Sequence, residues 1–135
     1  MYISDKKIKA PLQRVLNGLI ATAACAIFGG IYENFSHGVY SNYMVYAFLI
    51  PLMLSAFPSL LLLLNAKIDI PETVRTLWNL AVATLTVGCI FKGVLEIYGT
   101  TNRLMIVYPA AAAGFMTAAL VLSILEKIEK KTKVK

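Results

Sequence analysis

The chain contains few of the side chains that catalysis, metal binding and redox chemistry use. Its 135 residues include one histidine and two cysteines. A single histidine excludes a haem held by two axial histidines, and Cys25 and Cys89 lack the spacing of a zinc or redox motif. No glycine-rich phosphate loop, nucleophile elbow or Ser-His-Asp arrangement is present. The scarcity of such groups favours a non-enzymatic protein without deciding the point. We predict no cofactor, and we interpret the thiols as small apolar groups.

Formal charge is missing from most of the sequence. Only 15% of the residues are charged, whereas 59% are hydrophobic. The uncharged stretches contain 18, 33, 16 and 22 residues and lie at 15–32, 34–66, 76–91 and 104–125. A helix rises about 1.5 Å per residue, so roughly 20 residues cross the hydrocarbon core of a bilayer. This pattern excludes a soluble monomer and predicts a small polytopic membrane protein.

These stretches predict one all-α domain over residues 1–135. We expect a four-helix transmembrane bundle built from two tandem helical hairpins. Its helices are predicted at about 12–33, 42–64, 73–98 and 103–127. Short loops join them and leave no segment for a second domain.

Two prolines interrupt the second predicted helix. Pro51 and Pro58 lack an amide donor and clash with the preceding turn, so we expect a kink at one or both. The carbonyls of Ala47 and Leu54 would lose their partners within the helix. The hydroxyls of Ser55 and Ser59 are candidates to satisfy polar groups there.

Small residues recur at a spacing of four in the first and last predicted helices. Such rows allow close approach of another helix in lipid. The rows are Gly18, Thr22, Ala26 and Gly30, and Ala110, Gly114 and Ala118.

Eleven of the thirteen basic residues gather in three patches that four crossings place on one side. They are Lys6, Lys7, Lys9 and Arg14; Lys67 and Arg75; and Lys127, Lys130, Lys131, Lys133 and Lys135. Basic loops stay cytoplasmic, so both termini are assigned to the cytoplasm. No aromatic residues alternate with the C-terminal lysines, which favours the lipid bilayer over nucleic acid as their partner.

The two halves of the chain resemble each other. Residues 27–33 (IFGGIYE) align without a gap with residues 90–96 (IFKGVLE), and Arg14 aligns with Arg75. We predict a duplicated helix pair, related by an axis along the membrane normal. Glu33 and Glu96 then become equivalent, and a bundle would place both around one outer mouth.

The stretches 31–41 (IYENFSHGVYS), 83–88 (ATLTVG) and 93–102 (GVLEIYGTTN) resemble an uncharacterised family of small four-helix bacterial membrane proteins. The likeness covers most of the four predicted helices. It implies a location in the bacterial inner membrane. It implies no activity, substrate or cofactor.

Ionisable residues near the predicted outer mouth form the candidate site, because such groups are costly near a membrane and are often functional. They are Glu33, His37, Tyr40, Lys92, Glu96, Asn102 and Arg103. Lys92 and Glu96 stand four apart, a spacing that allows an ion pair. We expect this site to bind or pass a small cationic or polar solute. Passage would need a homo-oligomer or a larger membrane complex.

Three other interpretations stay open at this point. The same residues also fit a plain water interface at which Lys92 extends toward solvent. Glu33, His37 and Glu96 have the ligand types of a zinc, iron or manganese site. The chain also fits an accessory or scaffold subunit whose small-residue rows dock a larger membrane complex.

Overall fold

The computed structural model of the chain is all-helical and describes residues 2–65 and 68–135. Four helices in this part are long and apolar enough to cross a membrane. They are Lys9–Phe35, Asn42–Leu64, Glu72–Ile97 and Arg103–Lys133. The four predicted helices are thus confirmed, with the last extending to Lys133 instead of about residue 127. Lys67 of the predicted basic patches, and the side chains of Lys6 and Lys7, lie outside the described residues.

The first, third and fourth of these helices are nearly continuous, whereas the second is divided into short elements. The elements are α1 (Tyr2–Phe35), α2 (Asn42–Tyr46), α3 (Leu49–Pro51), the π-helical turn η1 (Leu52–Ala56), α4 (Phe57–Leu64), α5 (Glu72–Ile97), the 3-10 turn η2 (Arg103–Ile106) and α6 (Val107–Lys133).

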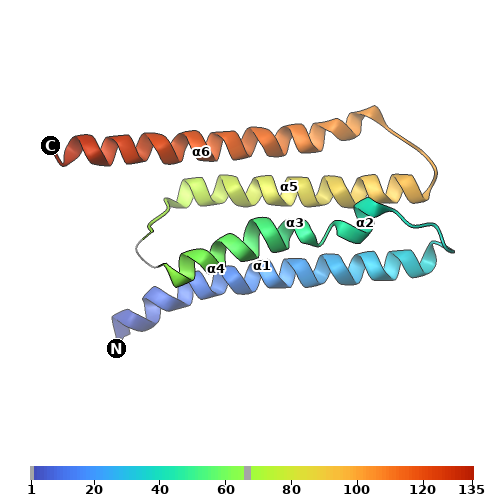
Figure 1. Ribbon diagram of the computed structural model, residues 1–135, viewed down its shortest axis with the longest axis horizontal. Coiled ribbons are helices and arrows are strands. Elements are labelled where there is room, and N and C mark those ends of the chain that lie inside the picture. Colours follow the sequence, from blue (N-terminus) through green and yellow to red (C-terminus); the bar gives the residue numbers. More distant parts are fainter. Residues whose placement is uncertain (1, 66–67) are drawn as a thin grey trace.

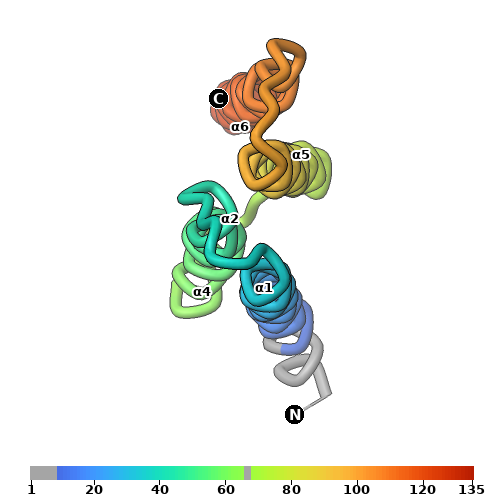
Figure 2. The backbone as a smooth tube through the Cα atoms, turned by 90° about the vertical axis from the view of Figure 1, so that its right-hand side faces the viewer, coloured from blue at the N-terminus to red at the C-terminus, as the bar shows by residue number. Residues whose placement is uncertain are grey.

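The helices lie side by side in an open row, which Figure 2 shows end-on. α6 packs mainly against α5, and the divided second helix stands between α5 and α1. Within the second helix the contact with α5 decreases: α2 packs mainly against α5, α3 packs against both α5 and α1, and α4 packs against α1. The second helix therefore moves away from α5 along its length. The predicted bundle is thus open, with α6 at one edge.

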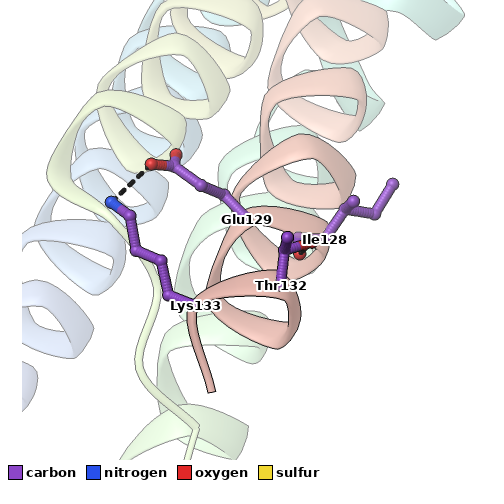
Figure 3. Close-up of polar contacts among 4 residues, drawn as sticks. All are labelled: Ile128, Glu129, Thr132 and Lys133. Carbon is purple, nitrogen blue, oxygen red and sulfur yellow. Dashed lines mark hydrogen bonds and ion pairs between the residues drawn. The ribbon is translucent and has the colours of Figure 1, made fainter. Parts of the chain in front are cut away.

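The start of α1 and the end of α6 lie at the same end of the row, hereafter the terminal end (Figure 1). The opposite end, with the connections α1–α2 and α5–η2, is called the far end. Figure 3 shows the last turns of α6, where Lys133 Nζ lies 2.6 Å from Glu129 Oε1 and the Thr132 hydroxyl donates to Ile128 O. Both charged side chains are exposed, so the pair stabilises the helix by only about 0.3–0.5 kcal/mol.

The prolines disturb the second helix as predicted. The chain forms a turn at Ala47 and Phe48, and a π-helical turn separates Pro51 from Pro58. The Ala47 carbonyl accepts a shorter-range bond from Ile50 N at 3.3 Å. π-Turns of this kind absorb a local irregularity within an otherwise helical segment.

The Leu54 carbonyl, which loses a partner because Pro58 has no N–H, accepts a bond from another helix. Trp78 Nε1 on α5 donates to it at 2.7 Å. The hydroxyls of Ser55 and Ser59 make no hydrogen bond within the described residues. The expectation that these serines satisfy the backbone is therefore wrong, and an indole N–H takes that role.

α1 packs against the second helix through Gly18 and Gly29, which lie on one face at the helical period of 3.6 residues per turn. A Cβ added at Gly18 would lie 2.8 Å from the Ala56 backbone, and one at Gly29 would lie 3.1 Å from Met44 O. One added at Gly30 would meet nothing within 4 Å. Each step of four residues rotates about 40° past a full turn, so a row at strict spacing four leaves the contact face. The predicted row was correct at Gly18 and wrong at Gly30.

On α6 the predicted row faces away from α5. The buried small residues are Ala112 and Ala119, which stand seven apart. Ala110 and Gly114 are exposed, and a Cβ added at Gly114 would meet nothing within 4 Å. Ala110 and Gly114 are therefore not covered by another helix within the described residues.

Candidate functional site

A groove of about 560 Å³ opens at the far end, between α2–α3, α5 and the η2–α6 segment. Four of the seven predicted site residues line it, namely Lys92, Glu96, Asn102 and Arg103. Thr100 and Thr101 add hydroxyls at the same edge, and apolar side chains such as Ile50 and Met105 form much of the remaining wall. We call this cavity the far-end groove.

The loop after α5 carries polar side chains over this groove because α5 ends in a Schellman motif. Gly99 adopts φ +70°, which suits a glycine. The amide of Thr100 donates to Leu95 O and that of Gly99 to Glu96 O, both at 3.0 Å. Asn102 Oδ1 then accepts from Leu104 N at 2.9 Å and caps η2. This cap places Arg103 at the first position of η2.

The other three predicted residues do not line the groove. Glu33 lies in the last turn of α1 and is half-buried, and its Oε1 has no hydrogen-bond partner within the described residues. His37 is exposed, with φ +55° and Nδ1 2.8 Å from Phe35 O. Tyr40 is 73% exposed.

The first turn of α2 explains why Glu33 and Glu96 do not share a cavity. Met44 is 1% exposed and is held between two glycines, Gly29 of α1 and Gly93 of α5. Ser41, three residues before Met44, is also only 1% exposed. α2 therefore occupies the space in which a closed bundle would form a common mouth. Glycine permits this close approach on both sides, because a Cβ at Gly93 would lie 3.0 Å from Met44.

Lys92 and Glu96 bind α2 instead of each other. The Ser41 hydroxyl donates to Glu96 Oε2 at 2.7 Å. Lys92 Nζ donates to the Tyr43 hydroxyl at 2.8 Å and lies 4.1 Å from the centre of that ring. Within residues 9–65 and 68–135 the only ion pair joins Lys133 and Glu129, so the predicted Lys92–Glu96 pair is not formed.

Sequence reasoning missed Ser41 and Tyr43 as partners of the charged pair. Ser41 immediately precedes α2, and Tyr43 lies in the first turn of α2. No local pattern reveals which helix face each meets, because both contacts span about 50 residues of sequence.

The structure does not group the residues of the alternative metal site. Among the described residues, no three His, Cys, Asp or Glu side chains come close enough to hold an ion. Glu96 lies on the groove, whereas Glu33 and His37 lie outside it. Glu33, His37 and Glu96 therefore do not form a metal site in the part of the chain that the structure describes. Cys25 and Cys89 are free and half-buried, and Cys89 Sγ donates to Tyr43 O at 3.2 Å.

Comparison with known protein families, with curated proteins and with solved structures finds no match for this chain. The resemblance to a family of small four-helix bacterial membrane proteins stays a prediction.

Proposed function

We propose that this chain is an integral membrane protein that binds a small polar solute in the far-end groove. The proposal includes a bacterial inner-membrane location with both termini cytoplasmic, so the groove would face outward. The observation that carries it is a cavity of about 560 Å³ with charges of both signs at one edge and apolar side chains elsewhere. Ligand sites commonly have volumes of about 300–1,000 Å³ and this mixed lining.

The charges of the groove favour a zwitterion over a simple cation. Lys92 and Arg103 contribute two positive charges, against one negative charge from Glu96. Glu96 also accepts the bond from Ser41, which satisfies part of its carboxylate. Arg103 is exposed and has no hydrogen-bond partner within the described residues, so it is free to bind an anionic group. A solute with both a carboxylate and an ammonium group fits this set.

Thermal unfolding in dodecyl maltoside tests this proposal, with the common amino acids and glycine betaine as probes. A ligand at 100 times its Kd stabilises a protein by about 2.7 kcal/mol. We expect at least one zwitterion to raise the Tm of the wild type and of Glu33→Gln. The rise should disappear in Arg103→Gln. No rise with any zwitterion, or a rise that persists in Arg103→Gln, would contradict the proposal.

A second candidate function is an accessory subunit of a larger membrane complex. The row Ala110, Gly114 and Ala118 on α6 favours it, because Gly114 meets no neighbour in this chain. A partner helix with its own small residues would fit against this row. Gly114→Leu should abolish crosslinking to a partner in native membranes. Gly30→Leu, at another glycine with open space, should not; equal crosslinking in both variants would argue against a docking role.

A further inference from the structure

A second cavity, of about 250 Å³, lies at the terminal end where the second helix has moved away from α5. α1, η1–α4, α5 and α6 all contribute to its wall. Its polar groups include Arg14 of α1 and Arg75 of α5, together with Ser55 and Ser59 from the second helix. We call it the terminal pocket. We propose that it binds a phosphate group, held between Arg14 and Arg75.

Arg75 of α5 lines this pocket, and one of its donors lacks a partner in the described part of the chain. Its Nη2 donates to Ile70 O at 2.6 Å, which fixes the guanidinium against the loop before α5. Its Nε is inaccessible to solvent and has no hydrogen-bond partner within the described residues. A buried donor without a partner is costly, so a shift of the guanidinium that lets Nε bind a ligand is favourable. The guanidinium edge is suited to two parallel bonds with a phosphate or a carboxylate.

Arg14 brings a second positive charge to the same cavity from a different helix. The charges that act on Arg14 are those of Arg75, Glu72 and Asp69. Neither acid lines the pocket, and neither forms an ion pair with an arginine among the described residues. Arg14 and Arg75 repel each other, and the two acids offset only part of this repulsion, so an anion bound in the pocket stabilises the arrangement.

The remaining wall is suited to phosphate oxygens. Ser55, Ser59 and Ser123 carry hydroxyl donors, and Asn79 carries an amide. Trp78 is held in place by its bond to Leu54 O, so it forms a fixed wall and not a donor for the ligand. Phosphate also fits the position of the pocket, since the terminal end carries most of the basic residues. In the predicted topology this end faces the anionic inner leaflet.

Trp78 is the only tryptophan in the chain and lines the pocket, so its fluorescence reports occupancy. The experiment uses the full chain in dodecyl maltoside. One arm titrates dihexanoyl-phosphatidylglycerol below its micellar concentration, and a second titrates potassium phosphate against potassium chloride of equal ionic strength. Dihexanoylglycerol, which has the acyl chains but no phosphate, is the control.

We expect a saturable fluorescence change with phosphatidylglycerol and none with dihexanoylglycerol. Arg14→Gln and Arg75→Gln should each weaken binding by about tenfold or more, the effect of losing a charge-assisted bond. Lys130→Gln, which removes an exposed charge outside the pocket at the same end, should bind like the wild type. If Arg75→Gln fails to fold, Arg75→Lys keeps the charge but loses the planar fork, and should bind more weakly as well.

The two arms separate the sources of the phosphate group. Saturation by phosphatidylglycerol alone identifies a lipid headgroup as the ligand. Saturation by inorganic phosphate as well shows that the free anion suffices. The proposal is overturned if neither probe saturates, if dihexanoylglycerol gives the same change, or if the arginine variants bind like the wild type.

Discussion

The charged side chains at the two ends of the molecule differ in how fully they are hydrogen-bonded. At the far end, Lys92 donates to Tyr43 and Glu96 accepts from Ser41, so both charges hold α2 against α5. At the terminal end, Arg75 keeps a buried Nε without a partner in the described residues. The difference follows from the path of the second helix, which packs on both α5 and α1 at the far end but mainly on α1 at the terminal end. Lys92 and Glu96 therefore hold two helices together, whereas Arg75 lines a cavity where the helices separate.

This comparison also separates two kinds of ligand chemistry. In the far-end groove, Lys92 and Glu96 are held by hydrogen bonds at one edge, and Arg103 is the charged side chain that stays free within the described residues. The terminal pocket offers two arginines and several hydroxyls, with no acid among its lining residues. The first arrangement suits a zwitterion and the second suits an anion. Variants that disturb one end alone should therefore leave the other end unchanged.

The largest expected effect comes from filling the contact between α5 and α6. A Cβ at Gly88 would lie 2.3 Å from Tyr108 Cβ, close to the backbone and not at a flexible tip. Gly88→Ala should therefore destabilise the fold by about 3 kcal/mol, the upper part of the usual range for overpacking. Thermal unfolding in detergent measures it.

Gly114→Ala is the matched control on the facing helix, because its added Cβ meets nothing. It should be neutral or slightly stabilising, since alanine favours a helix by about 1 kcal/mol over glycine. Gly88 also lines the far-end groove and not the terminal pocket. Equal Tm values for the two variants would show that α5 and α6 do not pack as described.

A smaller effect is expected at the terminal end, where Trp78 satisfies the Leu54 carbonyl. Trp78→Phe leaves that buried acceptor without its partner, which costs about 2 kcal/mol. Pro58→Ala restores an N–H four residues after Leu54. The double variant should therefore regain stability relative to Trp78→Phe, a coupling that a double-mutant cycle in Tm measures. Additive losses would contradict the account of this bond.

The smallest effect is expected at the far end, where Ser41 binds an exposed carboxylate. Ser41→Ala should lower stability by about 1 kcal/mol, because one side of the bond stays near solvent. Glu96→Gln keeps an acceptor for Ser41 and should lose less. Equal Tm losses in the two variants would indicate that the charge, and not the hydrogen bond, holds α2 in place.

The helices could be predicted from the sequence, but the contacts between them could not. Long uncharged stretches suffice to locate membrane-length helices, and proline chemistry predicts an irregular second helix. Gly18 packs against a neighbouring helix, whereas in the described part of the chain Gly30 and Gly114 do not, and spacing alone does not tell which face meets a neighbour. The duplication of the helix pair stays a prediction.

The contacts within the candidate site could likewise not be predicted from neighbouring residues in the sequence. The i, i+4 spacing of Lys92 and Glu96 allowed an ion pair, but tertiary partners on α2 were closer. Glu33 and Glu96 were assigned to one mouth on the assumption of a closed bundle. The insertion of Met44 between α1 and α5 replaces that mouth with packed side chains, and only three-dimensional coordinates reveal it.

The most direct test of the account is the sidedness of the two ends. Ser36→Cys marks the far end and Thr132→Cys marks the terminal end, each in a chain that also carries Cys25→Ala and Cys89→Ala. In intact cells, a membrane-impermeant maleimide should label the first variant and should reach the second only after the membrane is opened. Equal labelling of both in intact cells would show that the two cavities do not face opposite sides of a membrane.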